Sequence, residues 1–205
     1  MIKEINLFRT SLYEYTIPDN MDNIEDQFKS FTFKKPTDEH EVHHSFSTID
    51  KQVLNKLTDL KNHIYFSCKN YMREVLSYEN EPEILSSWIL KTLPKGKSGS
   101  HIHENSLFTG VYYPQHNPGM SVRLYNPVKR YFSGSIKKYS PLNCDFYDHV
   151  PKKNSLIIFN SNIEHRINPN LSNLTRYSLA FTVMPRGKFG SSEENMCYFK
   201  SGNGI

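Results

Sequence analysis

The sequence predicts a mostly β domain folded as a sandwich or barrel, of which the jelly roll is one form. Three observations predict it. From residue 86 onward, apolar residues recur with a period of two, in short runs separated by turn-forming residues. Aromatic residues make up 13% of the chain, and they favour strands. Alanine, the strongest helix former, occurs once, at Ala180.

The length of 205 residues suits a single domain, 1–205. We expect an irregular segment and a helix over 1–85, a jelly-roll core over 86–185 and a C-terminal tail over 186–205. A chain of this size buries about 70% of its unfolded surface, so it needs no disulfides to hold a core. Its three cysteines are far apart and odd in number, which is typical of a reducing compartment: Cys68, Cys144 and Cys197.

Charge and hydropathy exclude several classes of protein. The net charge is +4, and the lysines are spread in small pairs, so a nucleic-acid partner is not indicated. There is no run of about 18 apolar residues that could span a membrane. The first residues lack the apolar region of a signal peptide, so we expect a cytoplasmic protein.

The first predicted regular element is a helix over residues 47–78, after an irregular stretch over 1–46. Ser47 can act as its N-cap, with Asp50 approximating a capping box. Apolar residues then recur at steps of three and four and form one stripe: Val53, Leu57, Leu60, Ile64, Cys68, Tyr71 and Val75. We expect this stripe to cover the back of a sheet, with the helix ending before Pro82.

Seven strands are predicted after the helix, and the breaks between them are rich in Pro, Gly and Asn. The predicted strands are Ser87–Leu93, His101–Asn105, Thr109–Tyr113, Met120–Tyr125, Ser155–Phe159, Glu164–Ile167 and Arg176–Met184. The stretch 127–150 has no clear pattern, and a loop of that length is often functional. We expect loops 114–119 and 127–150 to shape a substrate pocket.

Three histidines are the candidate metal ligands. His101 and His103 are two residues apart, so on a strand they point to the same face. His165 follows a buried run, and alternation with Ile163 and Ile167 predicts that it points inward. A His-x-His pair or an inward histidine alone fits a structural role equally well. Three inward imidazoles together match the ligand count of a mononuclear metal site.

The last predicted strand has two unlike faces. One is large and apolar, and the other carries Arg176, Ser178, Ala180 and Thr182. This second face leaves room for a ligand, and a buried guanidinium needs an anionic partner such as a carboxylate, which accepts two parallel bonds. Ser178 could donate a further bond to the same anion. A structural ion pair with Glu164 or Asp148 is the open alternative.

These motifs together resemble the Fe(II)- and 2-oxoglutarate-dependent oxygenases of the double-stranded β-helix superfamily, specifically a branch found in bacteria and phages. The resemblance is strongest over residues 86–185. It rests on a histidine-rich segment leading into a Thr-Gly-Val-Tyr-Tyr strand, on an apolar segment leading to His165, and on an Arg-x-Ser eleven residues later. Asn154 stands at the turn position where the family usually has glycine, and Asn is the next best residue for positive φ.

The resemblance implies a double-stranded β-helix with the N-terminal helix packed on one sheet. It implies Fe(II) held by His101, His103 and His165, and 2-oxoglutarate anchored by Arg176 and Ser178. Dioxygen would be the second cosubstrate, and a substrate C–H bond would be hydroxylated with release of succinate and CO2. The protein would then be a 2-oxoglutarate-dependent dioxygenase, located in the host cytoplasm if a phage encodes it.

One departure from the superfamily concerns the metal ligands. Most members use His-x-Asp or His-x-Glu, whereas this chain has His103 at the carboxylate position. We expect a three-histidine site, with entry of a carboxylate from Glu104 or Asp148 as the alternative. Glu104 faces away from the histidines if the strand is regular.

Two other classes of function stay open from the sequence. A cupin-like metal-binding protein or isomerase also uses His-x-His, but its later glutamate and Pro-x-Gly are missing here. A non-catalytic jelly-roll structural protein has no need for an Arg-x-Ser behind three inward histidines. For the oxygenase we expect a small-molecule or peptidyl substrate, with an amino-acid side chain as the default and a nucleobase as the alternative. The sequence does not predict an oligomeric state.

Overall fold

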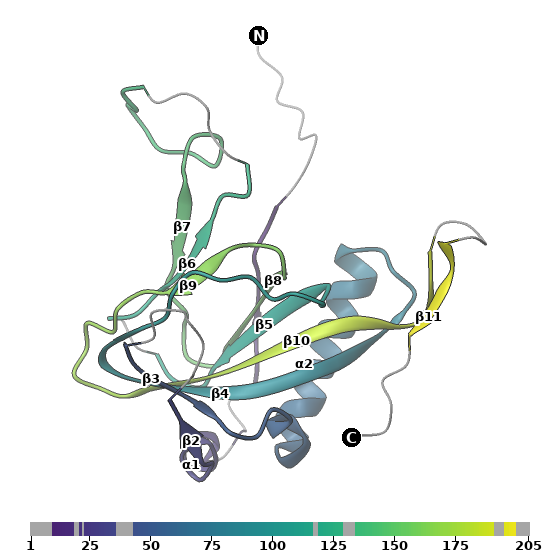
Figure 1. Ribbon diagram of the computed structural model, residues 1–205, viewed down its shortest axis with the longest axis horizontal. Coiled ribbons are helices and arrows are strands. Elements are labelled where there is room, and N and C mark those ends of the chain that lie inside the picture. The colour runs from purple at the N-terminus through teal and green to yellow at the C-terminus, as the bar shows by residue number, and fades with distance from the viewer. Residues whose placement is uncertain are drawn as a thin grey trace.

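Most of the strands form one large antiparallel sheet (Figure 1). The computed structural model describes residues 10–18, 21, 23–35, 43–116, 119–128, 134–190 and 195–199. The sheet has the order β1-β8-β5-β10-β4-β3-β2, with β11 paired to one end of β10. Its strands are β1 (Tyr13–Thr16), β2 (Phe33–Lys34), β3 (His43–Thr48), β4 (Glu81–Lys97), β5 (Phe108–Tyr113), β8 (Ser155–Asn160), β10 (Arg176–Phe189) and β11 (Cys197–Phe199).

A smaller antiparallel sheet faces one end of the large sheet. It has the order β7-β6-β9, with β7 spanning Phe146–His149, β6 Val122–Tyr125 and β9 His165–Ile167. Between the two sheets lies an apolar core that includes Val111 and Ala180 from the large sheet and Val122 and Leu124 from the small one. Two packed antiparallel sheets confirm the predicted mostly β, jelly-roll architecture.

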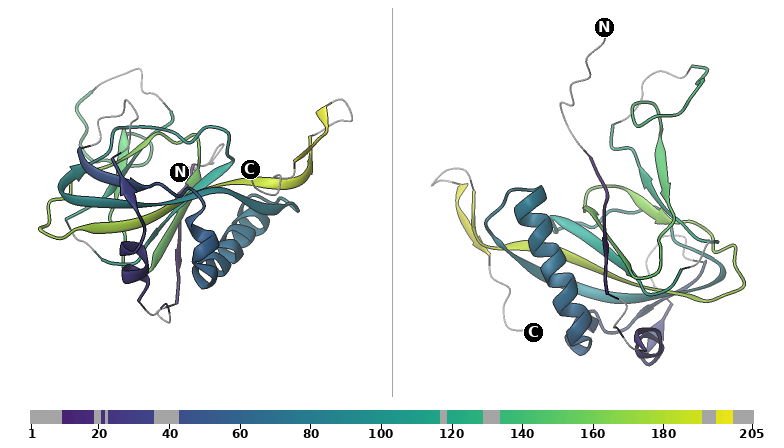
Figure 2. Two further views of the ribbon diagram at one scale, coloured as in Figure 1. Left: turned by 60° about the horizontal axis from the view of Figure 1, so that its bottom comes forward. Right: turned by 180° about the vertical axis from the view of Figure 1, so that it is seen from behind.

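Helices cover the outer face of the large sheet (Figure 2, right). The main one, α2, spans Thr58–Asn70, is preceded by a 3-10 turn, η1 (Val53–Lys56), and continues into a π-helical turn, η2 (Tyr71–Val75). The short α1 spans Ile24–Lys29. The predicted apolar stripe is correct, because its residues join the core beneath the helix together with the apolar face of β10: Tyr177, Leu179, Phe181 and Val183.

The start of the predicted helix is wrong. Ser47 is not an N-cap but lies in β3, paired with Leu90 of β4, and the α-helix begins at Thr58. Thr48 is also in the sheet, where its hydroxyl accepts a hydrogen bond from the backbone of Ile89. The edge of β4 offers unpaired backbone groups to this segment, so pairing in the sheet overrides the local capping pattern. The stretch 1–46, predicted as irregular, also contributes β1, α1 and β2 in its described part.

Six of the seven predicted strands are present, but two are longer than predicted. β4 runs from Glu81 to Lys97 instead of Ser87 to Leu93, and β10 continues past Met184 to Phe189. The exception is His101–Asn105, where only His101 makes a bridge, to His165, before the chain turns at Glu104 and Asn105. β7 was not predicted and lies within the unpatterned stretch 127–150, and β1, β2, β3 and β11 were not predicted either. No helix in the described part of the chain has the length and hydropathy to span a membrane.

Candidate metal centre and its buried arginine

Three histidines from different parts of the chain meet between the two sheets. His101, His103 and His165 each offer a ring nitrogen, and these atoms all lie within 4.8 Å of one another. Their ring centroids are 4.4 to 5.1 Å apart. Since imidazole nitrogens this close can share one ion, the structure brings together the ligand set that the sequence predicts.

Backbone hydrogen bonds place the three histidines without a regular strand at 101–105. His101 and His165 exchange two backbone bonds of 2.9 Å, so the two residues lie opposite each other. The backbone N–H of His103 then donates to the carbonyl of Ser161 at 3.0 Å. Ser161 lies in the loop before β9, so this hydrogen bond turns the chain away from the pairing with β9. The side chains of His101 and His103 still point to His165.

Carbonyl groups fix the orientation of two of the rings. Nδ1 of His165 lies 2.9 Å from the carbonyl oxygen of Ile163, and Nδ1 of His101 lies 3.1 Å from that of Gly99. A carbonyl oxygen can only accept, so Nδ1 carries the proton and Nε2 keeps its lone pair. Metal-binding histidines are commonly oriented in this way.

Burial keeps two of the imidazoles neutral. The pKa of His165 is lowered to about 3, first by burial and then by the nearby His101. The pKa of His103 is lowered to about 4, again first by burial and then by His101. Both rings are therefore deprotonated at neutral pH, and neutral imidazole is the form that binds a metal. The donor set thus fits a divalent transition metal.

The alternative carboxylate ligands do not enter the cluster. Asp148 lies on β7 and accepts two hydrogen bonds from Arg123, at 2.8 and 2.7 Å. Glu104 lines a cavity that also contacts His101 and His103. Within the described part of the chain, however, no carboxylate joins the cluster of three histidines. The cluster in the structure is therefore made of three histidines.

A buried and unpaired arginine lies on the interior face of β10. Arg176 is 1% exposed, and none of its three guanidinium nitrogens has a hydrogen-bond partner among the described residues. Burial lowers its pKa, while the ring of Tyr113, whose centroid is 5.3 Å from the guanidinium carbon, acts in the opposite direction. It makes neither of the ion pairs that the sequence left open, with Glu164 or Asp148. A buried charge without a partner is costly and points to an anionic ligand.

Two hydroxyls beside the arginine share its lack of partners. Ser178 is buried, and its Oγ has no hydrogen-bond partner among the described residues, as the predicted Arg-x-Ser pair requires. Thr92 of β4 pairs directly with Arg176, and its buried Oγ1 is unpartnered as well. Directly paired residues in antiparallel strands share a face. Sequence reasoning missed Thr92 and Tyr113, because the signal for both is the strand register, which a single sequence does not show.

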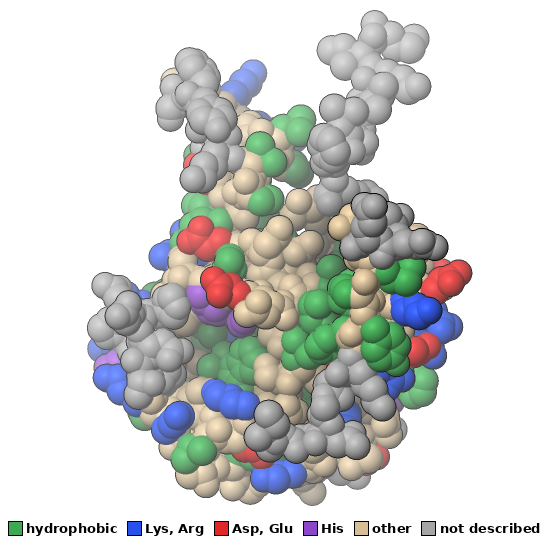
Figure 3. Space-filling view, turned by 45° about the vertical axis from the view of Figure 1, so that its right-hand side comes forward, with side chains coloured by type: hydrophobic (Ala, Val, Ile, Leu, Met, Phe, Trp, Pro, Cys, Tyr) green, Lys and Arg blue, Asp and Glu red, His purple; other side chains and the backbone are tan. Residues whose placement is uncertain are grey.

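A cavity of about 690 Å³ opens onto the histidines. Figure 3 shows histidine side chains (purple) beside a hollow in the surface, with acidic side chains (red) directly against them. The lining residues are Ser86, Trp88, Ser100, His101, Ile102, His103, Glu104, Glu164 and Thr182. None of the described residues of loops 114–119 and 127–150 lines it, so the expectation that these loops shape the pocket is wrong for their described part.

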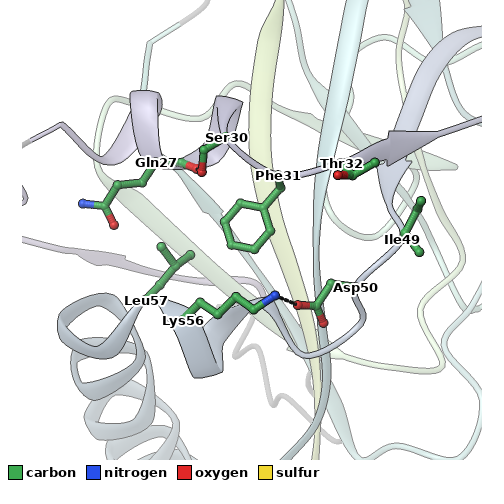
Figure 4. A pocket seen from close by; sticks show the side chains of 8 residues that line it. All are labelled: Gln27, Ser30, Phe31, Thr32, Ile49, Asp50, Lys56 and Leu57. Atoms are coloured by element: carbon green, nitrogen blue, oxygen red, sulfur yellow. Dashed lines mark hydrogen bonds and ion pairs between the residues drawn. The ribbon is translucent and has the colours of Figure 1, made fainter.

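A second cavity, of about 660 Å³, lies between α1, η1 and the end of β3 (Figure 4). It includes an ion pair of 2.8 Å between Lys56 and Asp50. Its lining carries no histidine and no buried unpaired group. It is therefore not part of the metal centre.

Comparison with known families agrees with this geometry. Residues 86–182 match the model of a family described as "Putative 2OG-Fe(II) oxygenase". The match covers most of the β core and just under half of the chain. The matched segment contains all three histidines, Arg176 and Ser178. Among curated proteins, none is similar enough in sequence to count as a match.

Solved structures of 2-oxoglutarate-dependent oxygenases share the fold. HygX from Streptomyces hygroscopicus, solved with nickel, 2-oxoglutarate and hygromycin B, is 10% identical with a TM-score of 0.60, over 86% of this chain and 83% of its own. A prolyl-4-hydroxylase from Pseudomonas putida is 11% identical with a TM-score of 0.58, over 86% and 94%. An oxygenase-family oxidoreductase from Burkholderia pseudomallei is 12% identical with a TM-score of 0.56, over 83% of each chain. At these identities the likeness establishes the double-stranded β-helix fold.

Proposed function

We propose that the protein is a Fe(II)- and 2-oxoglutarate-dependent dioxygenase that hydroxylates a C–H bond of its substrate. The observation that carries the proposal is the combination, in one interior, of three imidazoles within 4.8 Å and a buried guanidinium whose three nitrogens have no partner among the described residues. The first is a metal ligand set, and the second is a receptor for an anion. A structural or purely metal-binding jelly roll has no use for the second.

His101, His103 and His165 would hold the iron, through Nε2 in the two rings whose Nδ1 faces a carbonyl. Three protein ligands leave positions on a six-coordinate iron for the cosubstrate and dioxygen. When bound, the iron supplies the oxidative chemistry that decarboxylates 2-oxoglutarate and inserts oxygen into the substrate. HygX, which has the same fold, has been solved with nickel and 2-oxoglutarate, and this supports the assignment.

Arg176 would bind the distal carboxylate of 2-oxoglutarate with two parallel N–H bonds. Ser178 and Thr92, whose hydroxyls are buried and unpartnered, would donate to the same carboxylate. Tyr113 lies under the guanidinium and limits its movement. The chain's part in the reaction is therefore to neutralise, orient and desolvate the cosubstrate.

Hydroxylation is the simplest outcome that the site supports. The cavity opens directly onto His101 and His103, so a substrate C–H bond can lie beside the metal. Hydroxylation requires no further protein group there. A small molecule or an exposed side chain of a peptide would fit a cavity of about 690 Å³. The three free thiols support the cytoplasmic location expected from the sequence.

The experiment is release of succinate by anaerobically purified, Fe(II)-loaded protein after addition of 2-oxoglutarate and oxygen. Many such enzymes decarboxylate slowly without their substrate, so the measurement does not depend on knowing it. We expect succinate from the parent protein and none above background from His165→Ala or Arg176→Ala. Arg186→Ala is the matched control. Arg186 is on the same strand, but its side chain is half exposed and has a long ion pair of 3.8 Å with Glu83.

A second readout does not depend on turnover. Adding 2-oxoglutarate to the anaerobic Fe(II) protein should change the metal's absorption spectrum in the parent and in Arg186→Ala but not in Arg176→Ala. The proposal would be refuted if the protein binds iron but releases no succinate and shows no spectral response to 2-oxoglutarate. A cupin-like metal protein would then be the better interpretation.

A further inference from the structure

The cavity at the metal centre carries negative charge that the reaction with 2-oxoglutarate does not need. Glu104 and Glu164 follow and precede metal-site histidines in the sequence, and both line the cavity. Both are exposed, and neither carboxylate makes a hydrogen bond or ion pair with any described residue. The histidines and the cavity define the site, and the two glutamates give it its charge.

Nothing else in the described lining offsets these two carboxylates. The lining contains no lysine or arginine among the described residues. One ammonium group, that of Lys51, lies over the ring of Trp88. It lies 5.8 Å from the ring centroid of Trp88, donates to Ser47 Oγ at 2.7 Å and is not part of the lining. The cavity mouth is thus acidic in a protein whose net charge is +4.

The remaining walls suit the body of an amine-bearing molecule. Trp88 contributes an indole, whose face attracts cations and packs against hydrocarbon. The hydroxyls of Ser86 and Thr182 are bonded to each other at 3.0 Å, so one of these two O–H donors is already used and is not available to a substrate anion. The charges of bound Fe(II) and 2-oxoglutarate cancel. An anionic substrate would then meet two carboxylates and no lysine or arginine of the described lining, which costs affinity and slows association.

We propose that the substrate of this site is a cation, bearing an ammonium or guanidinium group held between Glu104 and Glu164 while its carbon chain runs along Trp88 toward the metal. The side chain of a lysine or arginine residue and a small aliphatic amine both belong to this class. The oxidation of that substrate rests on the proposed function. The preference for positive charge does not, because it comes from the two glutamates alone.

Trp88 makes the test direct, since it is the one tryptophan of the chain and it lines the cavity. Three probes of similar size and different charge are titrated against its fluorescence: benzylamine, benzyl alcohol and benzoate. Exposed ion pairs predict that two carboxylates favour the cation over the neutral probe by about 2- to 30-fold. We expect benzylamine to bind tightest and benzoate weakest, and we expect Trp88→Phe to remove the signal.

The matched variants separate the cavity from the overall charge. Glu104→Gln with Glu164→Gln should bring benzylamine and benzyl alcohol to within twofold of each other. Glu25→Gln with Glu83→Gln changes the net charge equally but lies outside the lining, so it should keep the parent's preference. Circular dichroism checks that both doubles are folded.

Equal affinity for the three probes, no binding of any of them, or a preference that survives in Glu104→Gln with Glu164→Gln would each overturn the inference. The titrations are run on metal-free protein and on anaerobic Fe(II) protein with 2-oxoglutarate. A preference for benzylamine in both, without succinate release, would mean that the proposed reaction fails while the charge selectivity stands. Succinate release without the preference would mean the reverse.

Discussion

Replacement of Arg176 by methionine should raise the stability of the protein without 2-oxoglutarate and abolish the stabilisation by 2-oxoglutarate. The guanidinium is 1% exposed and lacks hydrogen-bond partners among the described residues, so the free protein bears the cost of a buried charge. Apolar replacement of buried ionic groups often stabilises by about 1–4 kcal/mol. The lost contact with Tyr113, at 5.3 Å, offsets up to about 2 kcal/mol of that gain.

With about 2.5 kcal/mol for the apolar replacement and about 1 kcal/mol for the lost contact, both mid-range values, the net gain is about 1–2 kcal/mol. For a domain of 150–250 residues this corresponds to an increase in Tm of about 2–8 °C. Binding of 2-oxoglutarate at 100 times its Kd adds about 2.7 kcal/mol to the parent. Loss of two charge-assisted bonds, at about 1.5–3 kcal/mol each, weakens binding at least about 100-fold. At the same concentration the variant then gains at most about 0.4 kcal/mol.

The assay is urea unfolding of anaerobic Fe(II) protein with and without 2-oxoglutarate, followed by circular dichroism. Arg186→Met, on the same strand at an exposed position, is the control and should respond to 2-oxoglutarate as the parent does. The reasoning is refuted if Arg176→Met is less stable than the parent by more than about 1 kcal/mol and still gains stability from 2-oxoglutarate. Arg176 would then be a structural residue.

Three further predictions concern the frame of the site, each checked by urea unfolding. Gly110→Ala places a methyl group against the ring of Phe181, which lies opposite in the sheet, and should cost about 1–3 kcal/mol. Asp148→Asn should cost about 1 kcal/mol at pH 7. Arg123 lowers the pKa of Asp148 in the folded state, so this stabilisation is present above its unfolded pKa, about 3.9, and the parent and variant should converge as pH falls below it. Asn154 has a φ of 58°, so Asn154→Ala should cost about 1 kcal/mol more than Asn154→Gly, and equal losses would contradict the strain argument.

The sequence pattern predicted correctly which face of a strand each residue occupies, where that depends on the strand alone. In β10, alternation alone separates the apolar face of Leu179 and Phe181 from the interior face of Arg176 and Ser178, and the structure has the same division. His165 was placed inward by the same argument and is 4% exposed. These predictions succeed because the period of a strand is local.

Predictions that depend on a partner strand were the ones that failed. Ser47 has the residue type of an N-cap, yet pairing with β4 places it in a strand. His103 leaves the expected ladder because its N–H finds the carbonyl of Ser161. Thr92 shares the interior face with Arg176 because it lies across from it in the sheet. Each of these outcomes depends on which segments lie side by side, and one sequence does not contain that information.

The pairing of β1 with β8 has a consequence for aggregation. Residues Ser155–Phe159 of β8 are all buried, and four of them form an unbroken apolar run, which is the composition of an aggregation-prone segment. The outer edge of this strand is covered by β1, whose register runs from Tyr13 opposite Ile158 to Thr16 opposite Ser155. Residues 86–182, which carry the family match, do not include β1. Residues 86–182 alone would therefore leave the outer edge of β8 unpaired, and in this chain the four residues of β1 cover that edge.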